Sequence, residues 1–452
     1  MAAVRITSLI ILTGIIGCKI TNYSRITQTI SQPLPYFYFT KNTTFAPRFT
    51  TYPFTHIYMN KGLTALALGT FALGIAEFLM MGILSNIADA MHISVTDAGH
   101  FISAYAAGVC CGAPALLFAR KLPLKRLMAL LAAVIAVGNL CAAIAPGYWT
   151  FMAARFISGL PHGAYFGVGA IVARKLAAPG KQVSAVSIMI AGMTVATLIG
   201  VPAGTFIANT FHWRVAFYIV AAAGILTYIS IKVWVRDVGK LPDMGFRGQF
   251  RFLTTLPPWL IFGGVIFGQI GIYCWYSYID PMLTHVSRFT SAQLPWLMAL
   301  AGFGMFAGNL IAGRLSDRFR PAAVAAAVMA AAIPVLALFH LLAHVQVAAA
   351  LLMMLGTASL FGSGSPLQSS IVGYSAGGEM LGAACIQVAY NAGNAIAAYI
   401  GGLVINATGS YTAPSLVGIP VTAAGVILLI ILYRRNERPG APHRPYTPAP
   451  RA

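Results

Sequence analysis

Twelve long apolar segments follow one another between Lys61 and Tyr433, and each is long enough to cross a lipid bilayer as a helix. A hydrocarbon core of about 30 Å requires roughly 20 helical residues. Because lipid offers the backbone no hydrogen-bond partner, spanning segments must be α-helices or strands of a closed barrel. Barrel strands alternate polar and apolar residues, whereas these runs are continuously apolar. The sequence therefore predicts an all-α membrane protein with twelve transmembrane helices.

The predicted helices form two sets of six, separated by the longest and most polar internal connection. The spans are residues 62–84, 98–119, 124–145, 148–174, 184–208, 213–235, 257–284, 292–315, 321–342, 345–370, 380–407 and 411–433. The chain then divides into an extension (1–58), a six-helix half (59–235), a linker (236–256), a second half (257–435) and a tail (436–452). Two pseudo-symmetric halves are typical of transporters in which one half rocks against the other.

Lysine and arginine residues gather on alternate connections, which predicts the orientation. The basic connections carry Arg120, Lys121, Lys125 and Arg126, then Arg174, Lys175 and Lys181, then Lys232, Arg236, Lys240, Arg247 and Arg251, then Arg314, Arg318 and Arg320. The opposite connections carry little beyond Arg214 and Arg288. By the positive-inside rule, both termini are expected in the cytoplasm.

Composition excludes several other classes of protein. Only 8% of the residues are charged, against about 25% in soluble domains. The net charge of +20 does not indicate a nucleic-acid surface, because the basic residues lie beside the spans. The six cysteines form no CxxC pair, so no metal site is expected. The sequence has neither a nucleotide-binding motif nor an HExxH motif, which argues against an enzyme and for ion-driven transport.

The two ends of the chain differ from the spans. A short apolar run ends at Cys18 and is similar to a lipoprotein cleavage site, while Met59 resembles a natural start. Residues 1–58 are therefore interpreted as a dispensable or mis-started extension, with a processed signal or an ordered segment as alternatives. The tail from Pro439 is rich in proline and arginine and is expected to be disordered.

Three local patterns indicate moving helices. Small residues in the fifth span allow close helix packing, and Pro202 permits a bend because it lacks an N–H. The turn after the eighth span, GRLSDR, contains Asp317, which can accept hydrogen bonds from a helix N-terminus or pair with an arginine. The candidate gating residues are Gly192, Gly200, Pro202, Gly204, Gly313, Asp317 and Arg318. The alternatives are ordinary close packing for the glycines and topology control for the arginines.

These patterns, with the twelve spans, resemble the major facilitator superfamily over residues 59–435. The stretches that carry the closer resemblance are GTF at 69–71, AEF at 76–78, LPHGAYFGVG at 160–169 and GEMLGAA at 378–384. They are similar to the arabinose efflux permease group within the drug:proton antiporters. The resemblance implies that the bend in the fifth span seals the cytoplasmic side. The sequence departs from the family pattern there, because Gly200 and Pro202 are not adjacent, and Ala119 replaces an aspartate of the first-half turn.

Among the ionisable residues of the predicted spans, the candidate proton-coupling residues are Glu77, Arg155 and His162. An ionised carboxylate within the membrane costs about 2.5–3.5 kcal/mol, so Glu77 should face a cavity and tend to be protonated. The alternatives for Glu77 are a structural ion pair with Arg155 and an exposed outer position, and His162 could simply be a packing residue. Asp280, before Pro281, is expected at the membrane interface.

Polar and aromatic side chains recur at helical spacing on the fourth, seventh and eleventh spans. Aromatic rings stack on sugars or flat drugs, and amides bond hydroxyl groups. The candidate substrate-cavity residues are Tyr165, Gln269, Tyr273, Tyr276, Gln387, Asn391 and Asn394. The alternative is hydrogen bonding between helices together with aromatic residues at the membrane interface.

The sequence and the resemblance together predict a secondary active transporter that exports a sugar-like or drug-like amphipathic small molecule in exchange for protons. We expect a monomer in the lipid of a bacterial inner membrane, with the proton gradient as energy source and no cofactor. A proton-coupled importer and a non-transporting receptor of the same fold are the alternatives. The sequence does not identify the cargo.

Overall fold

The computed structural model describes residues 61–119, 122–178, 182–240, 250–316, 318–376 and 378–438. Four predicted features lie outside the described residues: the extension 1–58, Asp317, the centre of the linker and the tail from Pro439.

A helical segment coincides with each of the twelve predicted spans. The first half comprises α2 (Lys61–Met91), α3 (Val95–Ala119), α4 (Leu124–Ile144), α5 (Tyr148–Gly159), α6 (Pro161–Leu176), α7 (Gln182–Val195), the π-helical turn η1 (Ala196–Gly200), α8 (Val201–Thr210) and α9 (Trp213–Trp234). The second half comprises η2 (Arg251–Thr254), α11 (Leu256–Tyr276), α12 (Ile279–Pro281), η3 (Met282–Val286), α13 (Leu294–Ser316), α14 (Pro321–Leu342), α15 (Gln346–Gly362), α16 (Gly364–Tyr374), α17 (Glu379–Thr408), α18 (Ala413–Leu432) and η4 (Tyr433–Glu437). Within the described residues, eleven helical stretches are long and apolar enough to cross a membrane, and α3 is not among them.

Several predicted spans are interrupted helices, for local reasons. Pro161 begins α6 and has no N–H for the preceding turn, so the fourth span divides into α5 and α6. The fifth span contains the π-helical turn η1 directly before Pro202. In α2, Ile83 has non-helical dihedral angles (φ −136°, ψ 16°), which kink the helix. The seventh span was predicted to be continuous to residue 284, but α11 ends at Tyr276 and is followed by the short segments α12 and η3.

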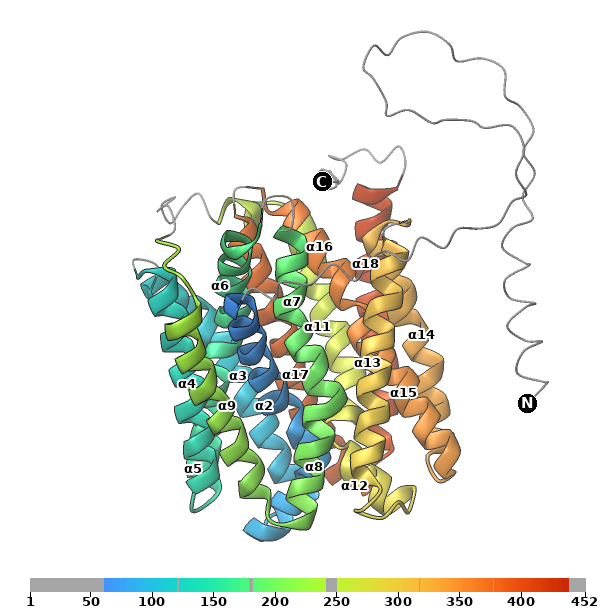
Figure 1. The fold of residues 1–452 in the computed structure, drawn as a ribbon. Coiled ribbons are helices and arrows are strands. Elements are labelled where there is room, and N and C mark those ends of the chain that lie inside the picture. Colours follow the sequence, from blue (N-terminus) through green and yellow to red (C-terminus); the bar gives the residue numbers. More distant parts are fainter. Residues whose placement is uncertain are drawn as a thin grey trace, which may run out of the picture. The chain divides into compact units, whose positions relative to one another are not determined.

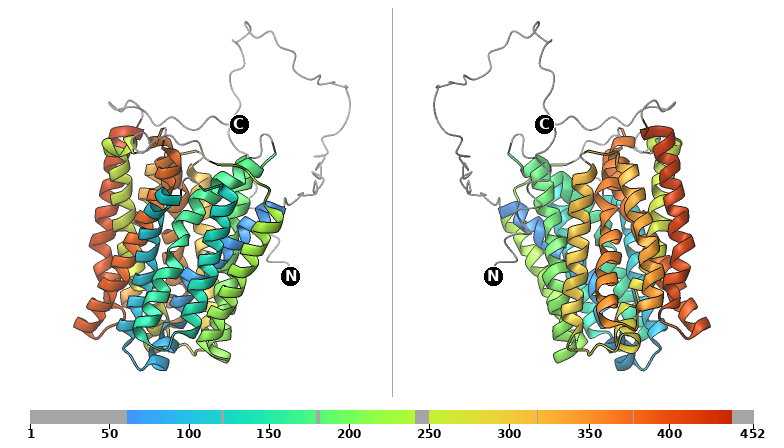
Figure 2. Two further views of the ribbon diagram at one scale, coloured as in Figure 1. Left: turned by 90° about the vertical axis from the view of Figure 1, so that its left-hand side faces the viewer. Right: turned by 90° about the vertical axis from the view of Figure 1, so that its right-hand side faces the viewer.

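The two halves repeat the same helix pairs, which is the pseudo-symmetry expected from the sequence. In the first half α2 packs on α7 and α9, while α3 packs on α5. The equivalent pairs in the second half are α11 with α17 and α18, and α13 with α15. The halves meet along two seams: α3 packs on α17, and η1 with α8 packs on α13 (Figures 1 and 2). Elements far apart in sequence therefore meet at the centre of the bundle.

The bundle has two ends that are used below as landmarks (Figure 1). At the lower end of Figure 1, α2 and α17 finish at Met91 and Thr408. At the upper end α18 passes into η4, where Asn436 and Glu437 are buried. The predicted tail boundary at residue 436 was therefore too early, because the Glu437 carboxylate accepts a hydrogen bond from the Ala322 N–H at the start of α14 (3.0 Å) and holds this turn against the helix.

Candidate functional site

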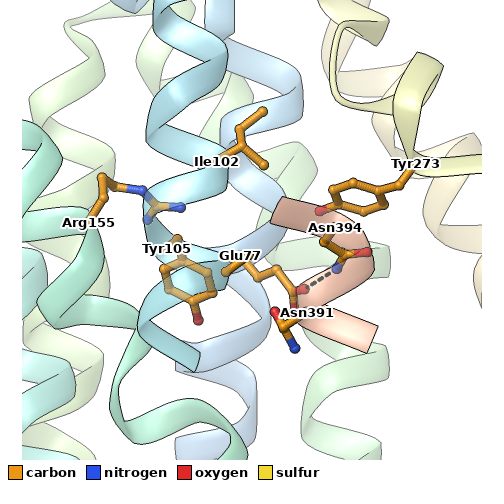
Figure 3. A pocket seen from close by; sticks show the side chains of 8 residues that line it. Glu77, Ile102, Tyr105, Arg155, Tyr273, Asn391 and Asn394 are labelled. Atoms are coloured by element: carbon orange, nitrogen blue, oxygen red, sulfur yellow. Dashed lines mark hydrogen bonds between the residues drawn. The ribbon is translucent and has the colours of Figure 1, made fainter. Parts of the chain in front are cut away.

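A cavity lies between the two halves, at the level of the seam between α3 and α17 (Figure 3). In this conformation the side chains close around this space and leave almost no free volume, so the site is occluded. The walls are formed by Glu77, Ile102, Tyr105, Ala106, Arg155, Tyr273, Asn391 and Asn394. Residues from α2, α3, α5, α11 and α17 thus converge on one space, and both halves contribute to it.

Glu77 projects from α2 into this cavity and is only 6% exposed. Its Oε1 accepts a hydrogen bond from Asn394 Nδ2 of the other half (3.3 Å, Figure 3). Its Oε2 lies 3.8 Å from His162 Nε2. The carboxyl group is therefore buried, contacts both halves, and has donors on two sides that can stabilise its ionised form.

Arg155 is fully buried on α5, yet it makes no direct ion pair with Glu77 in the described part of the chain. Its Nη1 donates to the carbonyl oxygen of Ala76 on α2 (2.9 Å), and its guanidinium lies 4.5 Å from the ring centre of Tyr105. The Nε and Nη2 atoms have no hydrogen-bond partner among the described residues. A buried donor without a partner is costly, so these two N–H groups are suited to donate hydrogen bonds to an oxygen atom of a ligand.

His162 connects the carboxylate to a second group on the cavity wall. Its Nδ1 forms a hydrogen bond with the Tyr105 hydroxyl (2.9 Å), while its Nε2 faces Glu77. The imidazole also stacks on Phe166, with ring centres 5.3 Å apart. An imidazole can donate from one nitrogen and accept at the other, so a proton can pass along this row once Nε2 and the carboxylate approach from 3.8 Å to hydrogen-bond distance.

The second half supplies neutral polar groups to the cavity. Tyr273 comes from α11, and Asn391 and Asn394 lie one helical turn apart on α17 (Figure 3). The Oδ1 atoms of both asparagines are buried and have no hydrogen-bond donor in the described structure. The cavity therefore offers unused donors on Arg155 and unused acceptors on the opposite wall.

The remaining candidate cavity residues do not line this space. Tyr165 points into the first half, where its hydroxyl donates to the carbonyl of Leu66 (3.3 Å). Tyr276 packs edge-on against Tyr273 at 6.0 Å. Gln387 bonds Gln368 in its own half (3.5 Å), and Gln269 is buried beside Gly393 between α11 and α17. None of these four residues lines the described cavity, and their role as cavity walls stays a prediction, because helical spacing fixes a face but not which neighbour covers it.

The candidate gating glycines of the fifth span all face α2. A Cβ atom on Gly192 would collide with the backbone carbonyl of Ala67, one on Gly200 with the Ile75 side chain, and one on Gly204 with the Leu79 side chain. Pro202 follows η1 in the same span. The helix that carries Glu77 is thus in direct contact with the span that was predicted to bend.

The other gating candidates lie at the upper end of α13. A Cβ on Gly313 would meet only the Ser365 side chain, at 4.0 Å, so this glycine is not tightly packed. Arg318 is exposed, and its backbone N–H donates to Leu315. The gating role of these residues stays a prediction.

Tyr105 was missed by the sequence reasoning although it packs against Arg155 and forms a hydrogen bond with His162. It lies on α3, in an otherwise apolar run, where a single tyrosine is unremarkable. A possible signal was its place on the same helical face as Ile102, three residues earlier. That signal becomes informative only when the position of the α3–α17 seam is known.

The fold and the central cavity define a two-half membrane transporter, and comparison with known proteins gives its family. The family model for the Major Facilitator Superfamily matches residues 66–384 and 261–452. The chain belongs to the major facilitator superfamily.

Three relatives illustrate the place of the chain within this family. The AraJ protein of Escherichia coli (strain K12) is 38% identical over 393 residues, covering 87% of this chain and all of that protein. The inner membrane transport protein YdhP of the same strain is 32% identical, covering 84% of this chain and 97% of YdhP. A protein of Helicobacter pylori (strain G27), named as a sugar efflux transporter, is 26% identical, covering 60% of this chain and 70% of that one. The resemblance to the arabinose efflux permease group is confirmed.

Solved structures share the fold at low sequence identity. The crystal structure of a D-xylose-proton symporter superposes with a TM-score of 0.64 at 15% identity, covering 83% of this chain and 98% of that chain. At this identity the similarity concerns the fold alone, and it confirms the predicted fold class.

Proposed function

We propose that this protein exports a sugar-like or amphipathic small molecule from the cytoplasm in exchange for protons. The observation that carries the proposal is the position of Glu77: a buried carboxyl group at the meeting point of the two halves, bonded to Asn394 and unpaired with Arg155. A group that contacts both halves can respond to their relative movement. A carboxyl group that no cation neutralises directly can take up and release a proton at modest cost.

Exchange requires that proton and cargo compete for the same site. An ionised carboxylate accepts stronger hydrogen bonds than a protonated one. A cargo hydroxyl that donates to Glu77 would therefore bind best when the proton has left. Protonation from the other side of the membrane would then favour release of the cargo, which is the order of events that antiport needs.

The unused polar atoms of the cavity favour a cargo rich in hydroxyl groups. A hydroxyl both donates and accepts, so neighbouring hydroxyls could accept from Arg155 Nε and Nη2 and donate to Asn391 Oδ1 and Asn394 Oδ1. The rings of Tyr105 and Tyr273 and the side chain of Ile102 add apolar surface for the carbon skeleton. The name of the Helicobacter pylori relative, which describes sugar efflux, agrees with this class of cargo.

The proposed orientation identifies the end of the bundle at which an exported cargo would enter. The basic connections meet at the upper end of the bundle, which we assign to the cytoplasm together with both termini. The name of YdhP places that relative in the inner membrane, and we propose the same membrane for this chain. Because one chain contains both halves, we propose that a monomer driven by the proton gradient alone is sufficient.

Inverted membrane vesicles provide the test, with a panel of radiolabelled monosaccharides that includes arabinose. Cytoplasmic faces point outward in such vesicles, so an exporter should load them when respiration acidifies the lumen. An uncoupler should abolish this loading for at least one sugar, and vesicles without the protein provide the baseline. Loading that is insensitive to the uncoupler would refute proton exchange, and loss of preloaded sugar on energisation would favour the importer.

A further inference from the structure

Asp280 lies deep between the two halves, although its sequence position predicted the membrane interface. It is on α12, the short segment that follows the break after Tyr276, and only 1% of it is exposed. Its Oδ1 has no hydrogen-bond partner among the described residues. A buried carboxylate is costly unless its contacts compensate, so the partner of its second oxygen is informative.

That partner is the backbone of α2, in the opposite half. Asp280 Oδ2 accepts a hydrogen bond from the Ser85 N–H at 2.8 Å. Ser85 follows Ile83, where the dihedral angles leave the helical region. A kink of this kind disturbs the bonding of nearby amides to their usual acceptors within the helix. The carboxylate of Asp280 thus supplies an acceptor at the place where α2 is broken.

Other polar contacts also join the halves near this end, but they are less protected from water. The Thr96 hydroxyl donates to Asn406 (2.9 Å), and Asn406 is exposed. Asn209 donates to the carbonyl of Ser291 (2.8 Å) at an exposed position. Water competes for exposed hydrogen bonds, whereas a buried bond to a charged acceptor contributes more. The Asp280 contact is therefore the strongest polar connection described at the lower end.

We propose that Asp280 is a latch that closes the lower end by fixing the kinked part of α2 to the second half. Asp280 is a positioning residue for α2, the helix that also carries Glu77. Glu77 lies eight positions before Ser85 on this helix, or about 12 Å along its axis. The second half thus holds α2 at two points, through Asn394 at Glu77 and through Asp280 at Ser85. Opening of the lower end must break the second contact, so release of Asp280 and rearrangement around Glu77 are linked through one helix.

Distance measurements between spin labels test the latch without any cargo. Cysteines at Ala90 on α2 and Thr408 on α17, both exposed at the lower end, would be labelled in full-length protein in lipid nanodiscs, with the native cysteines replaced by alanine. Double electron–electron resonance would compare the parent protein with Asp280→Ala and Asp280→Asn. Asp97→Ala is the matched control, because Asp97 is a carboxylate at the same end that bonds Ser94 in its own half.

We expect Asp280→Ala to raise the ratio of long to short distances at least tenfold, the effect of losing a hydrogen bond to a charged group. Asp280→Asn, which keeps an acceptor oxygen, should lie between the parent and the alanine variant, and Asp97→Ala should match the parent. If Asp280→Ala does not fold, Asp280→Leu, which fills the volume without oxygens, takes its place. Unchanged distances, or an equal shift in Asp97→Ala, would overturn the proposal. Because no transport is measured, failure here would leave the proton-exchange proposal untouched.

Discussion

The two halves of the protein bring different chemistry to the same cavity. The first half contributes the acidic and basic side chains of the site, namely Glu77, Arg155 and the adjacent His162, together with the phenol of Tyr105. The second half contributes the phenol of Tyr273 and two amides. Helix packing is nearly equivalent in the two halves, so the difference lies in side chains rather than in architecture. We interpret it as a division of tasks, with proton exchange confined to the first half and recognition of cargo shared by both halves.

Replacement of the Glu77 carboxyl group should have the largest effect on transport. Glu77→Gln keeps the shape and an oxygen acceptor for Asn394 but cannot titrate. We expect accumulation of cargo against its gradient to disappear, while exchange of labelled for unlabelled cargo persists at saturating cargo with a raised KM, because the neutral amide accepts a weaker hydrogen bond than the carboxylate. Uphill uptake and exchange in proteoliposomes would be measured side by side, with Asp97→Asn as the charge-matched control. Normal uphill transport in a stable Glu77→Gln protein would remove the proton role from this residue.

A packing change between α7 and α2, the helix that carries Glu77, should have the second largest effect on transport. Gly192→Ala places a methyl group against the backbone carbonyl of Ala67, so α7 must move away from α2. Overpacking of this kind typically costs about 1–3 kcal/mol, and we expect a turnover rate about tenfold lower. Thermal unfolding in detergent and initial transport rates would be compared with Gly364→Ala, where the added methyl meets only the Asn309 side chain at 3.9 Å. Equal behaviour of the two variants would show that close contact in the fifth span is unimportant.

The division of tasks predicts a different kind of defect in the second half. Asn391→Ala removes an unused acceptor from the cavity wall without touching the bond between Asn394 and Glu77. Loss of one hydrogen bond of about 1–1.5 kcal/mol should raise KM about five- to tenfold and leave the proton-to-cargo ratio unchanged. Gln387→Ala on the same helix is the control, because Gln387 bonds Gln368 away from the cavity. A change of that ratio in Asn391→Ala would contradict the division.

The smallest effect on transport is expected from removal of the Tyr105 hydroxyl, which bonds His162 beside Glu77. Tyr105→Phe keeps the ring beside Arg155 but removes the hydroxyl that bonds His162. We expect a change in transport rate of about two- to threefold, seen mainly as a displaced pH profile, because only a neighbour of the titrating group is altered. Tyr165→Phe, whose hydroxyl bonds Leu66 elsewhere in the first half, should leave the profile in place. Identical profiles for both variants would exclude Tyr105 from the proton path.

The sequence predicted the fold better than the site, for physical reasons. Span length, basic loops and small-residue patterns are local, so a helix is found at every predicted span. Glu77 could be recognised because a carboxylate inside the membrane is costly anywhere along a span. Tyr165 and Tyr105 could not be separated in this way, because each is a buried tyrosine and only tertiary packing decides which one meets the cavity. The burial of Asp280 between the halves could not be predicted, because the break after Tyr276 leaves no simple signal in the sequence.

Proton movement driven by cargo tests the central claim most directly. Proteoliposomes containing the purified protein and a pH-sensitive dye would be loaded with the transported sugar and diluted into sugar-free buffer without a pH gradient. Exit of sugar through an antiporter must bring protons in, so we predict acidification of the lumen by the parent protein and none by Glu77→Gln. Alkalinisation of the lumen by the parent protein would mean that sugar and protons leave together, and it would contradict the proposed exchange.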